Sequence, residues 1–213
     1  EDSLRIHYKN RNIFSKFNED KKYLRKAFLE SDRLWNNEYN KIDKIKYIIL
    51  AEAPLCGFNI SYIYNPNTNF TQFMYKSDLV FITNRKIKDK SDFHKILREN
   101  KIIIMDIFPY ALNESITAIN YKKMKDNNYK KLFDDIKDNY IRDKINKIMI
   151  KKDYNIQIFY RYSRIQKIIG NKLNEIMIDI ELIKSNESIH NIWKKGGGLD
   201  KEVMKNIIDK IYN

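Results

Sequence analysis

Short apolar runs alternate with amphipathic helical patterns along this chain, and this alternation limits the possible folds most strongly. The runs 47–52, 101–108 and 156–162 have the length and the β-branched content of buried strands. We predict a fourth strand over 178–183. Strands separated by helices imply parallel pairing with right-handed crossovers. The sequence therefore predicts an α/β protein with three α/β/α layers around a short, mostly parallel four-stranded sheet.

The segments between these runs carry apolar side chains at three- and four-residue steps, which is typical of helices. They cover 13–42, 91–100, 129–148, 164–177 and 200–212, whereas 70–83 fits either a helix or a strand. We find no internal repeat and no flexible linker. A chain of 213 residues is long enough for a sizeable core. We predict one domain over 1–213, with the N-terminal helical segment 1–46 packed on it.

Composition excludes several classes of protein. No run approaches 18 consecutive apolar residues, and residues 1–10 lack the apolar core of a signal peptide. Cys56 is the single cysteine, so neither an internal disulfide nor a cysteine-rich zinc site can form. His7, His94 and His190 are widely separated and form no spaced metal motif. We therefore expect no metal, no cofactor, no membrane contact and a reducing intracellular compartment, either cytoplasmic or nuclear in type.

The chain is strongly basic. It has 41 Lys and Arg residues against 28 Asp and Glu residues, a formal charge of +13. This excess predicts a polyanionic partner, and DNA is the partner that we favour, with the protein acting as a monomer. The alternative is a codon bias towards A/T-rich codons, which enriches Lys, Asn, Ile and Tyr without selection for binding.

Polar, aromatic and proline residues follow the predicted strands. In a parallel sheet, ligands bind beyond the carboxyl ends of the strands. These residues are Glu52 and Pro54 after the first strand, Asp106, Phe108, Pro109 and Tyr110 at the end of the second, and Ser185, Asn186, Ser188, His190 and Trp193 after the fourth. We therefore expect them to converge on one rim of the sheet.

Three of these stretches resemble the uracil-DNA glycosylase superfamily. "IILAEAPL" is similar to its first-strand motif, "IIIMDIFPYALN" to its second strand and following loop, and "IELIKSNESIHNIW" to its last strand and following loop. The order of elements agrees over roughly residues 20–212. The resemblance implies a base-excision enzyme that flips uracil or another altered or modified base out of DNA and hydrolyses its N-glycosidic bond.

The sequence also departs from the superfamily pattern. Ala51 stands where the motif has Gly, Leu55 replaces its final Gly, and no proline follows a histidine near the last strand. A different base, a modified base and a loss of catalysis therefore all stay open.

Cleavage of an N-glycosidic bond builds positive charge on the sugar and negative charge on the departing base. A carboxylate can stabilise the sugar cation or align a water molecule. Glu52 is our first candidate, and Asp106 competes with it. The alternatives are a turn-capping role for Glu52 and a satisfied structural carboxylate at Asp106. His190 is a candidate donor to the leaving base or to a phosphate, unless it is a packed or surface histidine.

Base recognition requires stacking rings and a polar side chain that reads a base edge. Phe58, Tyr62 and Tyr64 are the stacking candidates, and Asn113 is the reading candidate. Packing within the loop is the alternative for the rings, and a turn is the alternative for Asn113.

DNA phosphates are bound by hydroxyl, lysine and main-chain N–H groups. The candidates are Ser185, Ser188 and the "KKGGG" stretch with Lys194, Lys195, Gly196 and Gly197. Three consecutive glycines in a chain with only five expose N–H groups and permit close backbone approach. A simple turn before the last helix is the alternative.

Two other functions compete with a glycosylase. The first is a binding module on the same fold that grips DNA or a protein without chemistry. The second is an α/β enzyme that acts on free nucleosides or nucleotides, in which case the basic surface reflects codon bias alone.

Overall fold

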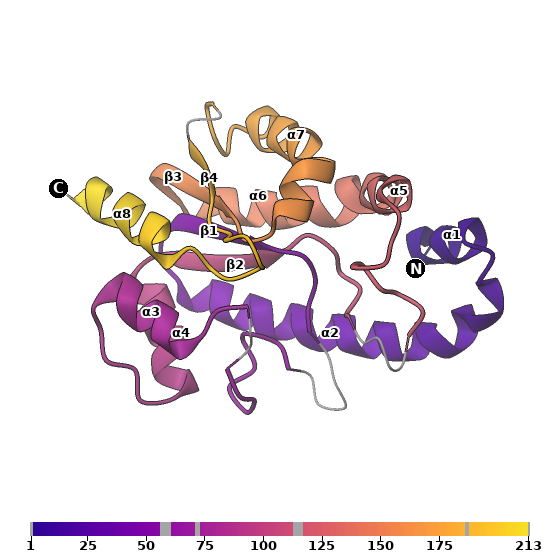
Figure 1. Cartoon of the computed structure of the whole chain (residues 1–213), viewed down its shortest axis with the longest axis horizontal. Coiled ribbons are helices and arrows are strands. Elements are labelled where there is room, and N and C mark those ends of the chain that lie inside the picture. Colours follow the sequence, from indigo (N-terminus) through magenta and orange to yellow (C-terminus); the bar gives the residue numbers. More distant parts are fainter. Residues whose placement is uncertain (1, 56–60, 71–72, 113–116, 186–187, 213) are drawn as a thin grey trace.

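The computed structural model describes residues 2–55, 61–70, 73–112, 117–185 and 188–212. Its α-helices are α1 (Asp2–Asn10), α2 (Phe17–Lys41), α3 (Lys76–Thr83), α4 (Lys90–Glu99), α5 (Asp126–Ile136), α6 (Arg142–Ile150), α7 (Ser163–Asp179) and α8 (Lys201–Tyr212). A short 3-10 helix, η1 (Phe14–Lys16), precedes α2, and a π-helical segment, η2 (Lys137–Ile141), connects α5 to α6. Its strands are β1 (Ile45–Ala51), β2 (Ile102–Asp106), β3 (Lys152–Tyr160) and β4 (Ile189–Asn191) (Figure 1). The ambiguous segment 70–83 thus contains a helix, α3.

The four strands form one parallel sheet in the order β2-β1-β3-β4. Ala51 of β1 is in register with Asp106 of β2, and Leu50 is in register with Tyr160 of β3. Strands β1 and β2 are buried along nearly their whole length, which explains their continuous apolar runs. The predicted three-layer α/β/α class and the first three predicted strands are confirmed.

The predicted fourth strand over 178–183 is wrong, because α7 continues to Asp179. Glu181 then adopts a left-handed conformation with φ of 60°. Its N–H donates to the Ile178 carbonyl at 2.9 Å, and the Leu182 N–H donates to the Met177 carbonyl at 2.8 Å. This pair of bonds is the Schellman motif that ends a helix. The alternating apolar residues over 178–183 therefore belong to a helix end, and the last strand is the three-residue β4.

Right-handed crossovers place α3 and α4 on one face of the sheet and α5, α6 and α7 on the other, as Figure 1 shows. On the second face, Tyr160 Oη donates to Asn174 of α7 at 2.7 Å. The long helix α2 connects both helical layers. Its Glu38 pairs with Arg98 of α4, and its Asp32 pairs with Lys144 of α6 at 2.6 Å.

The outer edge of β2 is covered by side chains. Trp35 Nε1 of α2 donates to the Ile104 carbonyl at 2.9 Å, and the Ile104 N–H donates to Tyr64 Oη at 2.7 Å. An uncovered edge strand would leave these backbone groups unpaired. Buried apolar side chains from Leu4 to Ile208 form one continuous core around the sheet. None of the described helices has the length and apolar character needed to cross a bilayer.

Candidate functional site at the carboxyl rim

The segments that leave β1 and β2 stay hydrogen-bonded beyond the strands. The Ile107 N–H donates to the Ala51 carbonyl, and the Phe108 N–H donates to the Glu52 carbonyl, both at 2.9 Å. Pro54 has no N–H to donate, but its carbonyl accepts from Leu112 N at 2.9 Å. These bonds hold the rim on which the candidate carboxylates lie.

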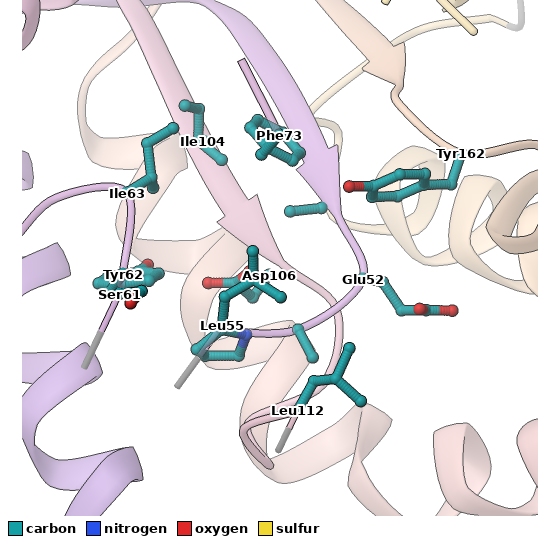
Figure 2. A pocket seen from close by; sticks show the side chains of 13 residues that line it. Glu52, Leu55, Ser61, Tyr62, Ile63, Phe73, Ile104, Asp106, Leu112 and Tyr162 are labelled. Atoms are coloured by element: carbon teal, nitrogen blue, oxygen red, sulfur yellow. The ribbon is translucent and has the colours of Figure 1, made fainter. Parts of the chain in front are cut away.

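The two carboxylates leave this rim in different directions. Asp106 is in register with Ala51, and side chains alternate between faces along a strand. Glu52, one residue beyond Ala51, therefore points to the opposite face from Asp106. Figure 2 shows the Asp106 carboxyl turned towards Tyr62 and the Glu52 carboxylate on the other side of the β1 end, below Tyr162. The pair cannot act on one bond from adjacent positions.

Both carboxylates contribute to one small cavity at this rim, here called the rim cavity. The described residues that line it are Ala51, Glu52, Ala53, Pro54, Leu55, Ser61, Tyr62, Ile63, Phe73, Ile104, Asp106, Leu112 and Tyr162. Its volume is about 70 Å³. Ligand pockets usually measure ~300–1,000 Å³, so this cavity is several times smaller than a typical ligand pocket. The Phe73 and Tyr162 rings lie edge to face in its wall, with centroids 6.1 Å apart.

Glu52 is held by a tyrosine of α5. Tyr129 Oη of α5 donates to Glu52 Oε1 at 2.9 Å. Burial raises the pKa of Glu52, while the Tyr129 hydrogen bond and the positive charge of Arg164 oppose that shift. The result is a carboxylate that is desolvated yet stabilised in its ionised form by two specific groups. Such an environment suits a group that faces a developing positive charge.

Asp106 lies in a more enclosed environment. Burial raises its pKa to about 7, against the opposing effects of a hydrogen bond from Tyr62 and the charge of Lys144. Lys144 is committed elsewhere, because its ammonium pairs with Asp32 and lies 3.7 Å from the centroid of the Trp35 ring. Asp106 is fully enclosed and bonded to Tyr62, which favours its structural interpretation.

The other predicted base-binding residues divide into three groups. Tyr62 lines the rim cavity, as expected, and bonds to Asp106. Tyr64 is buried and caps the β2 edge through Ile104, so it has a structural role. Phe58 and Asn113 lie outside the described residues.

His190 is not among the described residues that line the rim cavity. It lies within β4, opposite Phe159, and its Nε2 is 2.6 Å from Gln157 Oε1. Burial lowers its pKa. Ser185 and Ser188 precede β4, on the amino-terminal side of the strand, because the last strand begins at 189 instead of ending at 183. The expected convergence of these three residues on the rim is therefore wrong.

The "KKGGG" stretch, in contrast, follows β4 and reaches the rim. It forms a hairpin-like turn in which the Lys194 N–H donates to the Gly198 carbonyl at 2.8 Å. Gly196 and Gly197 have φ of 100° and 94°, a backbone region that favours glycine. Arg161 Nη1 donates to the Gly197 carbonyl at 2.9 Å and ties the turn to the end of β3. The stretch is therefore a turn, and Lys194 and Lys195 are exposed on it.

Two residues that follow β3, Arg161 and Tyr162, belong to the site but are not among the candidates predicted from sequence. The sequence pattern predicts a third strand over 156–162, whereas β3 ends at Tyr160. Tyr162 lines the rim cavity, and Arg161 Nε donates to the Phe73 carbonyl at 2.9 Å. The rule that ligands bind beyond strand ends would have found both residues if the strand end had been placed two residues earlier.

Arg164, at the start of α7, holds the loop that precedes α5, which carries two further lysines, against the same rim. Its guanidinium donates to the carbonyls of Lys122, at 3.0 Å, and Met124. Lys122 and Lys123 are exposed on that loop. Arg161 and Arg164 thus anchor two exposed lysine pairs near the rim cavity, here called the rim lysines: Lys122, Lys123, Lys194 and Lys195.

Comparison with protein-family models, curated proteins and solved structures finds no match. Within the part of the chain that the structure describes, no three His, Cys, Asp or Glu side chains gather as metal ligands would.

Proposed function

We propose that this protein binds DNA at the carboxyl rim and hydrolyses the N-glycosidic bond of an altered base held in the rim cavity. The observation that carries the proposal is the position of Glu52. Its carboxylate is desolvated, held by Tyr129 and adjacent to the aromatic residues Phe73 and Tyr162. A ring that enters the cavity would meet stacking partners and an oriented carboxylate together.

The chemistry assigned to Glu52 is electrostatic. As the base leaves, positive charge develops on the sugar, and an ionised carboxylate in a low-dielectric site stabilises that charge or aligns the attacking water. Tyr129 fixes one carboxylate oxygen, Oε1, and leaves Oε2 for this task. The rim lysines supply positive charge for backbone phosphates. We place this activity in a reducing intracellular compartment, in agreement with the single cysteine.

One observation favours a second candidate, a DNA- or protein-binding module without chemistry. His190, the expected donor to the leaving base, bonds to Gln157 and does not line the cavity. Excision in this protein would therefore need another donor for the departing base, whereas binding alone would not.

Turnover on modified oligonucleotides separates the two candidates. Duplexes and single strands that carry uracil or other altered bases are incubated with the protein, and abasic sites are detected by alkaline strand cleavage. The glycosylase predicts abasic sites on at least one substrate, with a loss of about hundredfold or more in Glu52→Gln. Binding without abasic sites on any substrate would support the binding module.

A further inference from the structure

A second hollow lies on the outer side of α3. It is lined by Phe70, Tyr75, Lys76, Phe81 and Lys201, among others, and we call it the α3 groove. It is a shallow hollow that is much more open to solvent than the rim cavity. α3 and α8 pack against each other beneath it.

Three aromatic residues line the α3 groove, and two lysines lie beside them. Tyr75 is 50% exposed and Phe81 is 37% exposed, so both rings are accessible from this side of α3. The Lys201 ammonium lies 4.8 Å from the centroid of the Phe81 ring, and Lys76 Nζ donates to the Lys88 carbonyl at 3.1 Å. The centres of protein–protein interfaces are depleted of lysine. Exposed rings among lysines instead match the surfaces on which single-stranded nucleic acid stacks its bases.

The α3 groove and the rim cavity have lining residues close together in the chain. Phe73 lines the cavity and Tyr75 lines the groove, and only Met74 separates them. The Cα atoms of Phe73 and Tyr75 are therefore at most about 7 Å apart. This distance equals the length of about two stacked nucleotides, at ~3.4 Å each. Arg161 lies at this junction, with its guanidinium 5.7 Å from the centroid of the Phe73 ring. A strand with one base in the cavity therefore reaches Tyr75 within a few nucleotides.

We propose that the α3 groove binds the single-stranded nucleic acid that flanks the base in the rim cavity. Tyr75 and Phe81 stack on the flanking bases, and Lys76 and Lys201 attract their phosphates. This inference rests on the nucleic-acid part of the proposed function and deepens it, because it names a single-stranded flank as the preferred substrate.

Binding of an unmodified strand tests the groove without any chemistry. Fluorescence anisotropy of labelled oligo(dT) of about 12 nucleotides measures affinity for the wild type, Tyr75→Ala and Phe81→Ala. We expect each variant to bind at least about fivefold more weakly, because one stacked base is lost. Tyr75→Phe keeps the ring and should keep the affinity. The matched control is Tyr154→Ala, since Tyr154 is 80% exposed near the amino end of β3 and should not alter binding.

The salt dependence gives a second readout. Lys201→Gln should reduce the slope of log affinity against log salt by about 0.7, the value for one phosphate contact on a single strand. Because Tyr75 is half exposed, Tyr75→Ala should stay close to the melting temperature of the wild type, and the melting temperature of each variant is measured in parallel.

Two outcomes would overturn the inference. One is oligo(dT) binding that is unchanged in both Tyr75→Ala and Phe81→Ala. The other is an absence of oligo(dT) binding together with self-association that Tyr75→Ala abolishes, since the groove would then be a protein interface. A failure of the glycosylase proposal alone gives a different result. Tyr75→Ala would then bind oligo(dT) more weakly than the wild type, while no substrate yields abasic sites. If the protein forms abasic sites but these variants bind oligo(dT) with unchanged affinity, the glycosylase proposal stands and the proposal for the α3 groove is refuted.

Discussion

Replacement of Asp106 by asparagine should make the protein more stable at alkaline pH and change the way its stability depends on pH. Asp106 is buried, and its pKa rises from 3.8 to about 7 in the folded protein. The native state therefore binds this proton more tightly than the unfolded state. Since the unfolding free energy falls with pH wherever the native state holds more protons, stability is lost as pH rises from about 4 to about 7. A shift of about 3 pKa units corresponds to about 4 kcal/mol.

The amide introduced by Asp106→Asn carries no charge at any pH, and its side-chain oxygen can still accept from Tyr62. The advantage of this variant over the wild type should therefore grow by up to about 4 kcal/mol between about pH 4 and pH 8. Urea unfolding followed by tryptophan fluorescence measures this difference across the pH range. Asp43→Asn, at an exposed carboxylate before β1, is the control and should show no comparable growth. A difference between Asp106→Asn and wild type that is the same at both pH values would refute the reasoning.

Two further substitutions test the site and the edge of the sheet. Tyr129→Phe removes a hydrogen bond that lowers the pKa of Glu52, so the acid limb of the activity–pH profile should move to higher pH. The control is Tyr160→Phe, which loses a hydrogen bond to Asn174 of α7 and should leave the acid limb in place. Trp35→Phe removes the donor to the Ile104 carbonyl and should lower the unfolding free energy by about 1–3 kcal/mol in urea titrations. An unchanged acid limb in the first case, or an unchanged unfolding midpoint in the second, would contradict these assignments.

The first three strands were predictable because each is an apolar run followed by turn-forming or polar residues. β4 was not, because Ile-His-Asn has no apolar run and depends on pairing with β3. The alternating apolar residues over 178–183 fit a strand as well as they fit a helix end. The structure shows that α7 includes residues 178 and 179 and ends before the left-handed Glu181. This single error displaced Ser185, Ser188 and His190 relative to the rim.

The position of Glu52 at a strand end was also predictable from sequence, since a carboxylate ended a buried run. The divergence of Glu52 and Asp106 was not, because it depends on the register between β1 and β2. The partners Tyr129 and Arg164 lie 77 and more residues away along the chain, and no local pattern connects them to Glu52.

The central claim is that Glu52 acts on a base held in the rim cavity, and single-turnover excision by Glu52→Gln tests it most directly. Glutamine keeps the shape of the side chain and can still accept from Tyr129, but it cannot carry negative charge. On the best substrate of the oligonucleotide panel, we predict that Glu52→Gln forms abasic sites about hundredfold or more slowly than wild type, while Glu175→Gln, at an exposed glutamate of α7, matches wild type. Equal rates for Glu52→Gln and wild type would contradict the account.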